Sequence, residues 1–169
     1  MAGRCERGSG KTAFMSFQKT PAGTRGSRAM SGSNPVARFA TKAMTKWHRR
    51  SGDKFQGMDL LYLTTVGAKS GQQRQSTVSR FPDGADSWLI VASAGGSAQH
   101  PAWYHNIAAH PDQVWAEFGG QRFRVTPVQL AGEERERAWQ RITAAQPRYA
   151  GYVGKTDREI PVIRLTRAA

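Results

Sequence analysis

Cysteine, acidic residues and long apolar runs are all scarce in this sequence. A single cysteine, Cys5, among 169 residues excludes an intrachain disulfide framework and a cysteine-rich zinc site, and it indicates a reducing, cytoplasmic setting. No apolar run is long enough to span a bilayer, and the N-terminus has no apolar segment of the kind found in secretory signals. We therefore expect a soluble or surface-bound protein with one domain.

Positive charge is concentrated in the N-terminal third. The chain has 25 Lys and Arg against 12 Asp and Glu, and residues 1–58 hold 12 of the basic but only 2 of the acidic residues. Residues 59–169 hold 13 and 10 and are nearly neutral. A nucleic-acid-binding domain carries its basic residues on the folded surface, so we expect no specific nucleic-acid partner. Residues 1–33 lack apolar periodicity and are predicted to form a disordered basic leader.

Residues 34–50 predict an amphipathic helix. Asn34 and Pro35 suit its N-cap and first position. Apolar residues recur at helical spacing while basic residues line another face: Val36, Phe39, Ala40, Ala43 and Trp47 against Arg38, Lys42 and Lys46. The helix either packs on the domain and covers a barrel end, or lies on the anionic inner face of the cell membrane.

Beyond residue 57, short apolar segments alternate with turns. Strands are expected at 60–65, 77–81, 87–92, 113–118, 122–128 and 160–165, and helices at 101–109 and 133–145. Gly119 and Gly120 suit a hairpin turn. Many short strands with few helices predict a small antiparallel barrel over residues 57–169.

Metal-ligand and serine-hydrolase patterns are missing. The four histidines show no metal-ligand spacing, and His105 and His110 are five apart, which places them off a common helical face. No Gly-x-Ser-x-Gly elbow occurs. We therefore expect no metal site and no serine nucleophile.

The turn after the first expected strand carries two cations. Residues 64–74 read Thr-Thr-Val-Gly-Ala-Lys-Ser-Gly-Gln-Gln-Arg. Gly67 and Gly71 permit the positive φ of a tight turn, whose backbone N–H groups can converge on an oxyanion while Lys69 and Arg74 supply charge. In a Walker A loop the lysine follows the second glycine, so this segment is not one. It is an anion cradle or, alternatively, a hairpin turn with solvated basic residues.

A second candidate site follows the strand expected at 87–92. The sequence continues through Ser93-Ala94-Gly95-Gly96, and a ligand ring can lie directly on the backbone of Gly95 and Gly96 because no Cβ intervenes. Pro101 suits the first turn of a helix that would present Trp103, Tyr104 and Asn106. The alternative is that these aromatic residues belong to the core.

Tyr149 and Tyr152 are the third candidate. They flank Gly151 and lie close to Gly154, which favours a mobile, substrate-facing lid. The alternative is again core packing.

Four ordered segments carry a family pattern: Leu-Thr-Thr-x-Gly-x-Lys-Ser-Gly-Gln-x-Arg at 63–74, Val-Ala-Ser-x-Gly-Gly at 91–96, Pro-x-Trp-Tyr-x-Asn at 101–106 and Thr-Asp-Arg-x-Ile-Pro-Val at 156–162. Together they resemble the deazaflavin (coenzyme F420)-dependent nitroreductase family of the flavin/deazaflavin oxidoreductase superfamily. The resemblance extends from Gly57 to Leu165. It implies a mainly β fold with helices, the split β-barrel of FMN-binding-like proteins.

The resemblance also implies roles for particular residues. The phosphate and oligoglutamate tail of F420 would be bound by Lys69, Ser70, Gly71 and Arg74. The tail or the ring edge would contact Ala92, Ser93, Ala94, Gly95, Gly96 and Asn106, and the ring would lie against Trp103. The acceptor would lie beside Tyr149 and Tyr152, whose phenols can donate to a developing oxyanion.

The implied reaction is hydride transfer from reduced F420 to an electrophilic small molecule: an activated enone, a quinone or a nitro compound. Alternatives are an FMN-dependent oxidoreductase of the same fold, and a non-catalytic F420 carrier or membrane-surface protein. The sequence departs from the family pattern at three places. Ala94 stands where many relatives have a basic residue, the segment 75–79 lacks the proline and aromatic residue that relatives often have, and Gln146 replaces a tyrosine. These departures affect the expected identity of the acceptor more than that of the cofactor.

Overall fold

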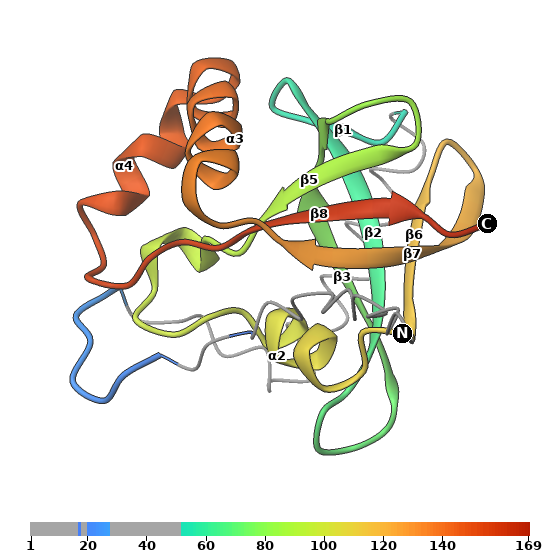
Figure 1. The fold of residues 1–169 in the computed structure, drawn as a ribbon, viewed down its shortest axis with the longest axis horizontal. Coiled ribbons are helices and arrows are strands. Elements are labelled where there is room, and N and C mark those ends of the chain that lie inside the picture. The colour runs from blue at the N-terminus through green and yellow to red at the C-terminus, as the bar shows by residue number, and fades with distance from the viewer. Residues whose placement is uncertain (1–16, 18–19, 28–51) are drawn as a thin grey trace, which may run out of the picture.

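The computed structural model describes residues 17, 20–27 and 52–169. The helix expected at 34–50 and most of the leader expected at 1–33 lie outside the described residues. Within them, an eight-stranded antiparallel sheet curls into a half-barrel (Figure 1). The expectation of a mainly β protein with few helices is confirmed.

The sheet has the order β1-β2-β6-β7-β8-β5-β4, and β3 pairs with β2. The strands are β1 (Lys54–Phe55), β2 (Met58–Val66), β3 (Gln73–Ser79), β4 (Phe81–Pro82), β5 (Ser87–Val91), β6 (Val114–Phe118), β7 (Gln121–Gln129) and β8 (Val162–Arg167). Gly119 and Gly120 form the β6–β7 turn with φ of 57° and 71°, a left-handed pair that matches the twist of a hairpin.

The structure differs from the sequence prediction at β3, which begins at Gln73 rather than at residue 77. The ladder with β2 continues to the pair Val66 and Gln73. Residues 73–75 are exposed, and β3 pairs with β2 alone. A polar segment can therefore join the sheet at its edge without an apolar pattern, which is why periodicity missed it.

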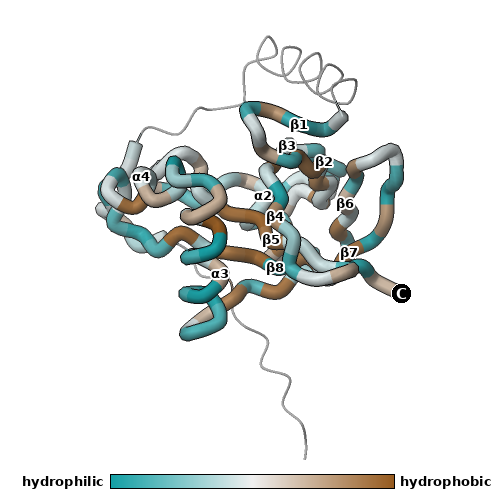
Figure 2. The backbone as a smooth tube through the Cα atoms, turned by 90° about the horizontal axis from the view of Figure 1, so that it is seen from above, coloured by the Kyte–Doolittle hydropathy of each residue, from teal (hydrophilic) through white to brown (hydrophobic). Residues whose placement is uncertain are grey.

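The core joins the sheet to two helices. Strand β2 is buried along most of its length. Its Leu61 and Leu63 belong to one cluster with residues such as Ile90, Ile107 and Leu165. Helix α2 (Ala102–Ala109) covers this part of the sheet. Helix α3 (Gly132–Ala145) buries Ala138 and Ile142 in a second cluster. Figure 2 shows the apolar strands in the interior and the hydrophilic side of α3 outside.

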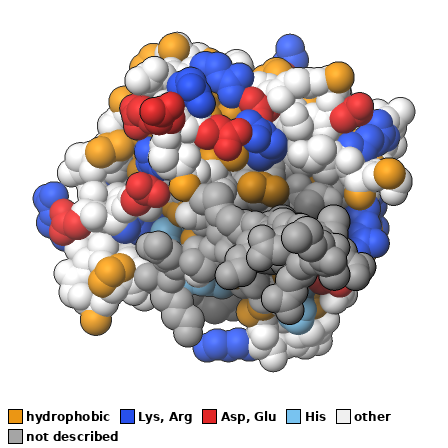
Figure 3. Space-filling model, viewed as in Figure 1, with side chains coloured by type: hydrophobic (Ala, Val, Ile, Leu, Met, Phe, Trp, Pro, Cys, Tyr) orange, Lys and Arg blue, Asp and Glu red, His pale blue; other side chains and the backbone are white. Residues whose placement is uncertain are grey.

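Ion pairs attach α3 to the sheet. Asp83, in the β4–β5 turn, binds Arg141 of α3 and Arg164 of β8, and Arg164 also binds Glu134. Acidic and basic side chains lie side by side on the upper part of the face in Figure 3. In the described part of the chain, no helix has the length and apolar content needed to cross a bilayer.

Residues 20–27 differ from the disordered leader expected at 1–33. The Ser27 N–H donates to the Gly96 carbonyl (2.9 Å), and the Asp157 N–H donates to the Arg25 carbonyl (3.1 Å). A Cβ on Gly26 would lie 2.0 Å from the Ala98 nitrogen, so only glycine permits this approach. Backbone hydrogen bonds do not require an apolar pattern, and composition alone therefore could not reveal the docking.

Candidate functional site

The β2–β3 turn is closed by backbone hydrogen bonds. The Gly67 N–H donates to the Gln72 carbonyl (2.9 Å) and the Gly71 N–H to the Gly67 carbonyl (2.8 Å). Gly71 has a φ of 64°, which favours glycine, whereas Gly67 does not have the positive φ expected from the sequence. A Cβ on Gly67 would lie 2.5 Å from Ser70 Oγ, and the exposed Ser70 side chain would have to rotate away. The turn thereby exposes Lys69 and Ser70 to solvent.

This turn keeps hydrogen-bond donors and charge available. Among the described residues, the backbone N–H groups of Lys69 and Ser70 have no acceptor, and Lys69 has no ion-pair partner. Arg74 is exposed, and its Nη2 donates to Gln72 Oε1 (3.2 Å). Two cations beside two unbonded N–H groups suit an anionic ligand.

Asn106 supports the turn from behind. Asn106 is 8% exposed. The Ala68 N–H donates to Asn106 Oδ1 (3.0 Å), and Asn106 Nδ2 donates to Thr65 Oγ1 (3.0 Å). Asn106 therefore connects α2 to the β2–β3 turn, and the structure places it under the cradle rather than at its surface.

The loop that follows β5 has an unusual backbone. Ala94, Gly95 and Gly96 have φ of 45°, 63° and 80°, and an alanine in this region costs roughly 1–2 kcal/mol. Ala94 and Gly95 are exposed, Ser93 is half-buried and Ala92 is buried. The N–H groups of Ser93, Ala94 and Gly95 have no acceptor among the described residues. Successive N–H groups of this kind are typical of backbone sites that bind an oxygen atom of a ligand.

Gly96 is needed for a different reason from the one the sequence suggested. A Cβ there would lie 2.7 Å from Lys155 Cβ and 3.2 Å from the Tyr152 carbonyl. The close neighbours thus belong to α4 (Ala150–Val153) and to the segment that follows it. Gly95 has open space at its Cβ position, so a ligand can approach the backbone there.

Trp103 and Tyr149 lie in the core. Each is 7% exposed. Trp103 belongs to the cluster under α2, and Tyr149 packs edge-on against Phe81 with ring centroids 5.7 Å apart. Burial raises the pKa of Tyr149. The structure therefore places both side chains away from the open surface that a ligand would occupy.

Tyr152 is the more accessible tyrosine. It is half-buried, its ring lies edge-on to Tyr149 (5.6 Å) and Lys155 Nζ lies 5.6 Å from its centre. The segment forms a short 3₁₀ turn, η2 (Pro147–Tyr149), followed by α4. The segment that the sequence predicts to be a lid is therefore helical.

Arg158 and His100 are the residues that motif reasoning left without a role. Arg158 Nη1 lies 3.0 Å from His100 Nδ1. A guanidinium can only donate, so Nδ1 accepts and the imidazole proton lies on Nε2. Burial, with the charge of Arg158 and nearby His105, lowers the pKa of His100 to about 4. The Thr-Asp-Arg segment at 156–158 was the feature of the sequence that could have pointed to Arg158.

A cavity of about 220 Å³ lies beside these residues. Its walls include His100, Tyr104 and Arg158, and Thr20, Pro21 and Thr24 close another side. The Tyr104 hydroxyl donates to Gln129 Oε1 (2.8 Å), and Phe17 packs edge-on against the Tyr104 ring (5.1 Å). The N-terminal segment therefore forms part of a wall next to the β5–α2 loop.

The family model of the F420H(2)-dependent quinone reductases matches residues 36–167. The chain belongs to this family. An F420H(2)-dependent quinone reductase of Mycobacterium tuberculosis is 44% identical over 110 residues, covering 63% of this chain and 72% of that protein. A putative F420H(2)-dependent quinone reductase of the same species is 38% identical over 105 residues, covering 62% and 87%.

Solved structures confirm the split β-barrel. The F420-H2 dependent reductase FDR-A is 40% identical with a TM-score of 0.56, over 63% of this chain and 92% of that one. A structure described as a domain-swapped dimer is 33% identical with a TM-score of 0.58, over 78% and 99%. The resemblance to F420-dependent reductases is thereby confirmed. Membership of the F420H(2)-dependent quinone reductase family makes the protein an oxidoreductase that uses reduced F420 as its hydride donor.

Proposed function

We propose that this protein reduces quinones or similar electrophilic carbonyl compounds with reduced F420. The observation that carries this proposal is the pair of donor-rich backbone segments, the β2–β3 turn and the β5–α2 loop, which Asn106 and α2 connect. Each has successive N–H groups without an acceptor among the described residues. This donor set fits a cofactor with an anionic tail and a ring that carries carbonyl oxygens.

The tail would lie on the β2–β3 turn. Lys69 and Arg74 would pair with phosphate or glutamate oxygens, and the Lys69 and Ser70 N–H groups would donate to the same anion. Gly71 contributes the turn's shape. Asn106 holds the turn in place from the core side, so we assign it a supporting role rather than direct contact.

The ring would lie on the β5–α2 loop, where Ala94 and Gly95 are exposed and no large side chain intervenes. Reduced F420 supplies the hydride, and the protein supplies binding, orientation and exclusion of water. Tyr152 would line the acceptor side, and its phenol could donate to an oxygen that gains charge. Tyr149 supports Tyr152 through their edge-on contact.

The deciding experiment is a cofactor and turnover assay. Purified protein is tested for binding of F420 and of FMN by calorimetry, and reduced F420 is then supplied with menadione, a cyclohexenone or a nitroarene. We expect F420 binding and fastest oxidation with the quinone. Tight FMN retention with NADPH-driven turnover would refute the proposal in favour of a flavin enzyme. F420 binding without turnover on any acceptor would identify a carrier.

We also propose peripheral binding to an anionic membrane, which rests on the sequence of residues 34–50 alone. Their basic and apolar residues suit the headgroup region. The test is co-sedimentation with liposomes containing anionic lipid at low and high salt, compared with neutral liposomes. Salt-sensitive binding to anionic liposomes only is expected, and failure to bind them at low salt would reject this part.

A further inference from the structure

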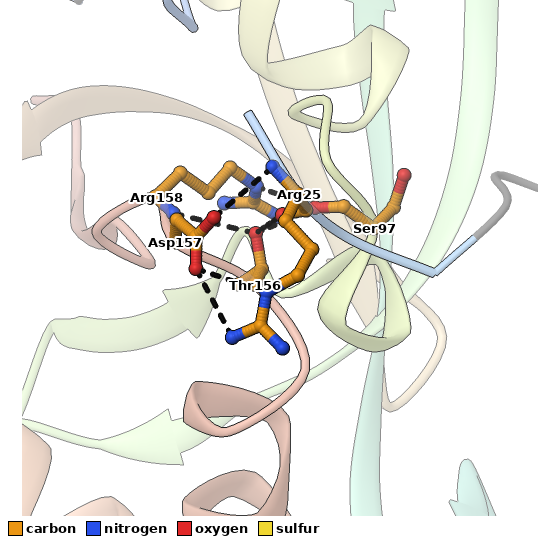
Figure 4. A network of polar contacts seen from close by, with 5 residues as sticks. All are labelled: Arg25, Ser97, Thr156, Asp157 and Arg158. Carbon is orange, nitrogen blue, oxygen red and sulfur yellow. Dashed lines mark hydrogen bonds and ion pairs between the residues drawn. The ribbon is translucent and has the colours of Figure 1, made fainter. Parts of the chain in front are cut away.

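Arg158, in the turn between α4 and β8, braces the β5–α2 loop from behind. Its Nη2 donates to the carbonyls of Ala92 (3.0 Å) and Ser93 (2.7 Å), and its Nε donates to the carbonyl of Ser97 (2.8 Å). One side chain therefore holds both ends of the loop. Figure 4 shows the contact at the Ser97 end, where Thr156 and Asp157 meet the N-terminal segment.

The charge of Arg158 is buried without a carboxylate partner in the described part of the chain. The residue is 8% exposed. Its neighbour Asp157 binds Arg25, and Glu159 binds Arg135. Burial lowers the pKa of Arg158, but an arginine stays protonated in proteins. A buried charge paired only with carbonyls and an imidazole adds little to the free energy of unfolding. We therefore attribute the role of Arg158 to the positions in which it holds these carbonyls.

The loop needs such a brace. Its three successive left-handed residues, 94–96, are supported internally by two bonds, from the Gly96 N–H to the Ser93 carbonyl (2.9 Å) and from the Ser97 N–H to the Ala94 carbonyl (3.1 Å). Consecutive left-handed residues are intrinsically unfavourable and persist where surrounding contacts define them. Arg158 also turns the flanking carbonyls toward the interior.

We propose that Arg158 is a positioning residue for the cofactor ring. By holding the carbonyls of Ala92, Ser93 and Ser97, it keeps the N–H groups of 93–95 available and aligned for ring oxygens. Its fork of five N–H groups can hold several carbonyls at once, which a lysine cannot reproduce. This inference rests on the proposed function, because it requires the ring to lie on this loop.

The test compares Arg158→Gln and Arg158→Lys with the control Arg135→Gln. Arg135 also donates to a buried carbonyl, that of Ile160 (3.0 Å), and is similarly shielded, but it lies on α3. We expect the dissociation constant for F420 to rise about 10- to 100-fold in Arg158→Gln and less in Arg158→Lys. A deazaflavin lacking phosphate and glutamates should lose the same factor. Arg135→Gln should change both constants less than about twofold while lowering the melting temperature.

Two outcomes would overturn the inference: folded Arg158→Gln binding both cofactor forms as the wild type does, or losing affinity only for the form with the tail. If Arg158→Gln does not fold, the affinities of Arg158→Lys for the two cofactor forms are compared with those of the wild type instead. Amide hydrogen exchange of Gly96 and Ser97 without cofactor gives an independent readout. Faster exchange there in Arg158→Lys supports the brace even if F420 does not bind, whereas unchanged exchange refutes it.

Discussion

Arg25 and Asp157 are bonded through both their backbones and their side chains, although they lie 132 positions apart in the chain. The Arg25 N–H and guanidinium donate to the Asp157 carboxylate at 3.1–3.2 Å, and the Asp157 N–H donates to the Arg25 carbonyl. The Thr156 hydroxyl donates to the same carbonyl (3.0 Å). The N-terminal segment is thereby attached to the turn that holds Arg158.

Removal of residues 1–27 should destabilise the domain. The truncation deletes the Arg25 and Ser27 hydrogen bonds and the contact of Phe17 with Tyr104, and we expect a loss of about 1–3 kcal/mol in the free energy of unfolding. Urea denaturation measures it. A matched truncation of residues 1–15 keeps every described contact and should unfold like the full chain. Equal stability of all three proteins would show that the segment contributes nothing.

Lys69→Ala and Arg74→Ala should each weaken F420 binding. A charge-assisted hydrogen bond to an anionic tail contributes on the order of 1.5–3 kcal/mol, which is roughly 10- to 150-fold in affinity. Because the tail is remote from the reacting carbon, turnover at saturating cofactor should change less. Calorimetry with F420 and with a tail-less deazaflavin checks this.

The tail-less form should be nearly indifferent to both substitutions. Arg137→Ala, which removes an exposed cation on α3, should leave both affinities unchanged. Equal losses for the two cofactor forms would instead mean that Lys69 and Arg74 support the fold of the turn. A loss confined to the form with the tail differs from the equal loss expected for Arg158→Gln, so the two assignments are tested separately.

His100 should make stability fall between about pH 6.5 and pH 4. Its folded-state pKa is about 4 against 6.5 for the free side chain, so as pH falls through this range the unfolded chain takes up the proton first. Allowing for partial exposure, the loss should be on the order of 1–2 kcal/mol. His100→Gln keeps an acceptor for Arg158 but removes the titration, so its urea midpoint should depend less on pH in this window. An NMR titration with a pKa near 6.5 would contradict the assignment.

Asp83→Asn should weaken the attachment of α3. The Asp83 side chain is 6% exposed and binds two arginines. Burial alone would raise its pKa, but Arg141 and Arg164 lower it below 3.8, so its contribution is present above pH 3.8 and is lost as pH falls further. We expect a loss of about 2 kcal/mol at neutral pH, since the arginines are partly solvated.

Glu133→Gln provides the control for Asp83→Asn, because Glu133 forms an exposed pair with Arg137 on the same helix. Such pairs contribute about 0–0.5 kcal/mol. The melting temperature should therefore be clearly lower in Asp83→Asn than in Glu133→Gln. Equal melting temperatures would show that the Asp83 ion pairs are as weak as exposed ones.

The sequence alone determined the elements whose signals are local. Short apolar segments between turns predicted β2 and β5, alternation predicted β7, and the glycine pair 119–120 predicted a hairpin turn. The motifs at 63–74 and 91–96 predicted two loops, whose role in ligand binding stays a prediction. These features depend on neighbouring residues, so periodicity and turn chemistry are sufficient to find them. Membership of the F420H(2)-dependent quinone reductase family was accessible from the same motifs.

Only the tertiary structure decided which candidate side chains are exposed. Trp103 and Tyr149 have the residue types of a binding site but lie in the core, and residues 20–27 have the composition of a disordered segment but bind the domain. Arg158 reaches carbonyls 61 to 66 positions away. Contacts over such separations depend on how the sheet curls and where each turn ends, and no local pattern in the chain records that geometry.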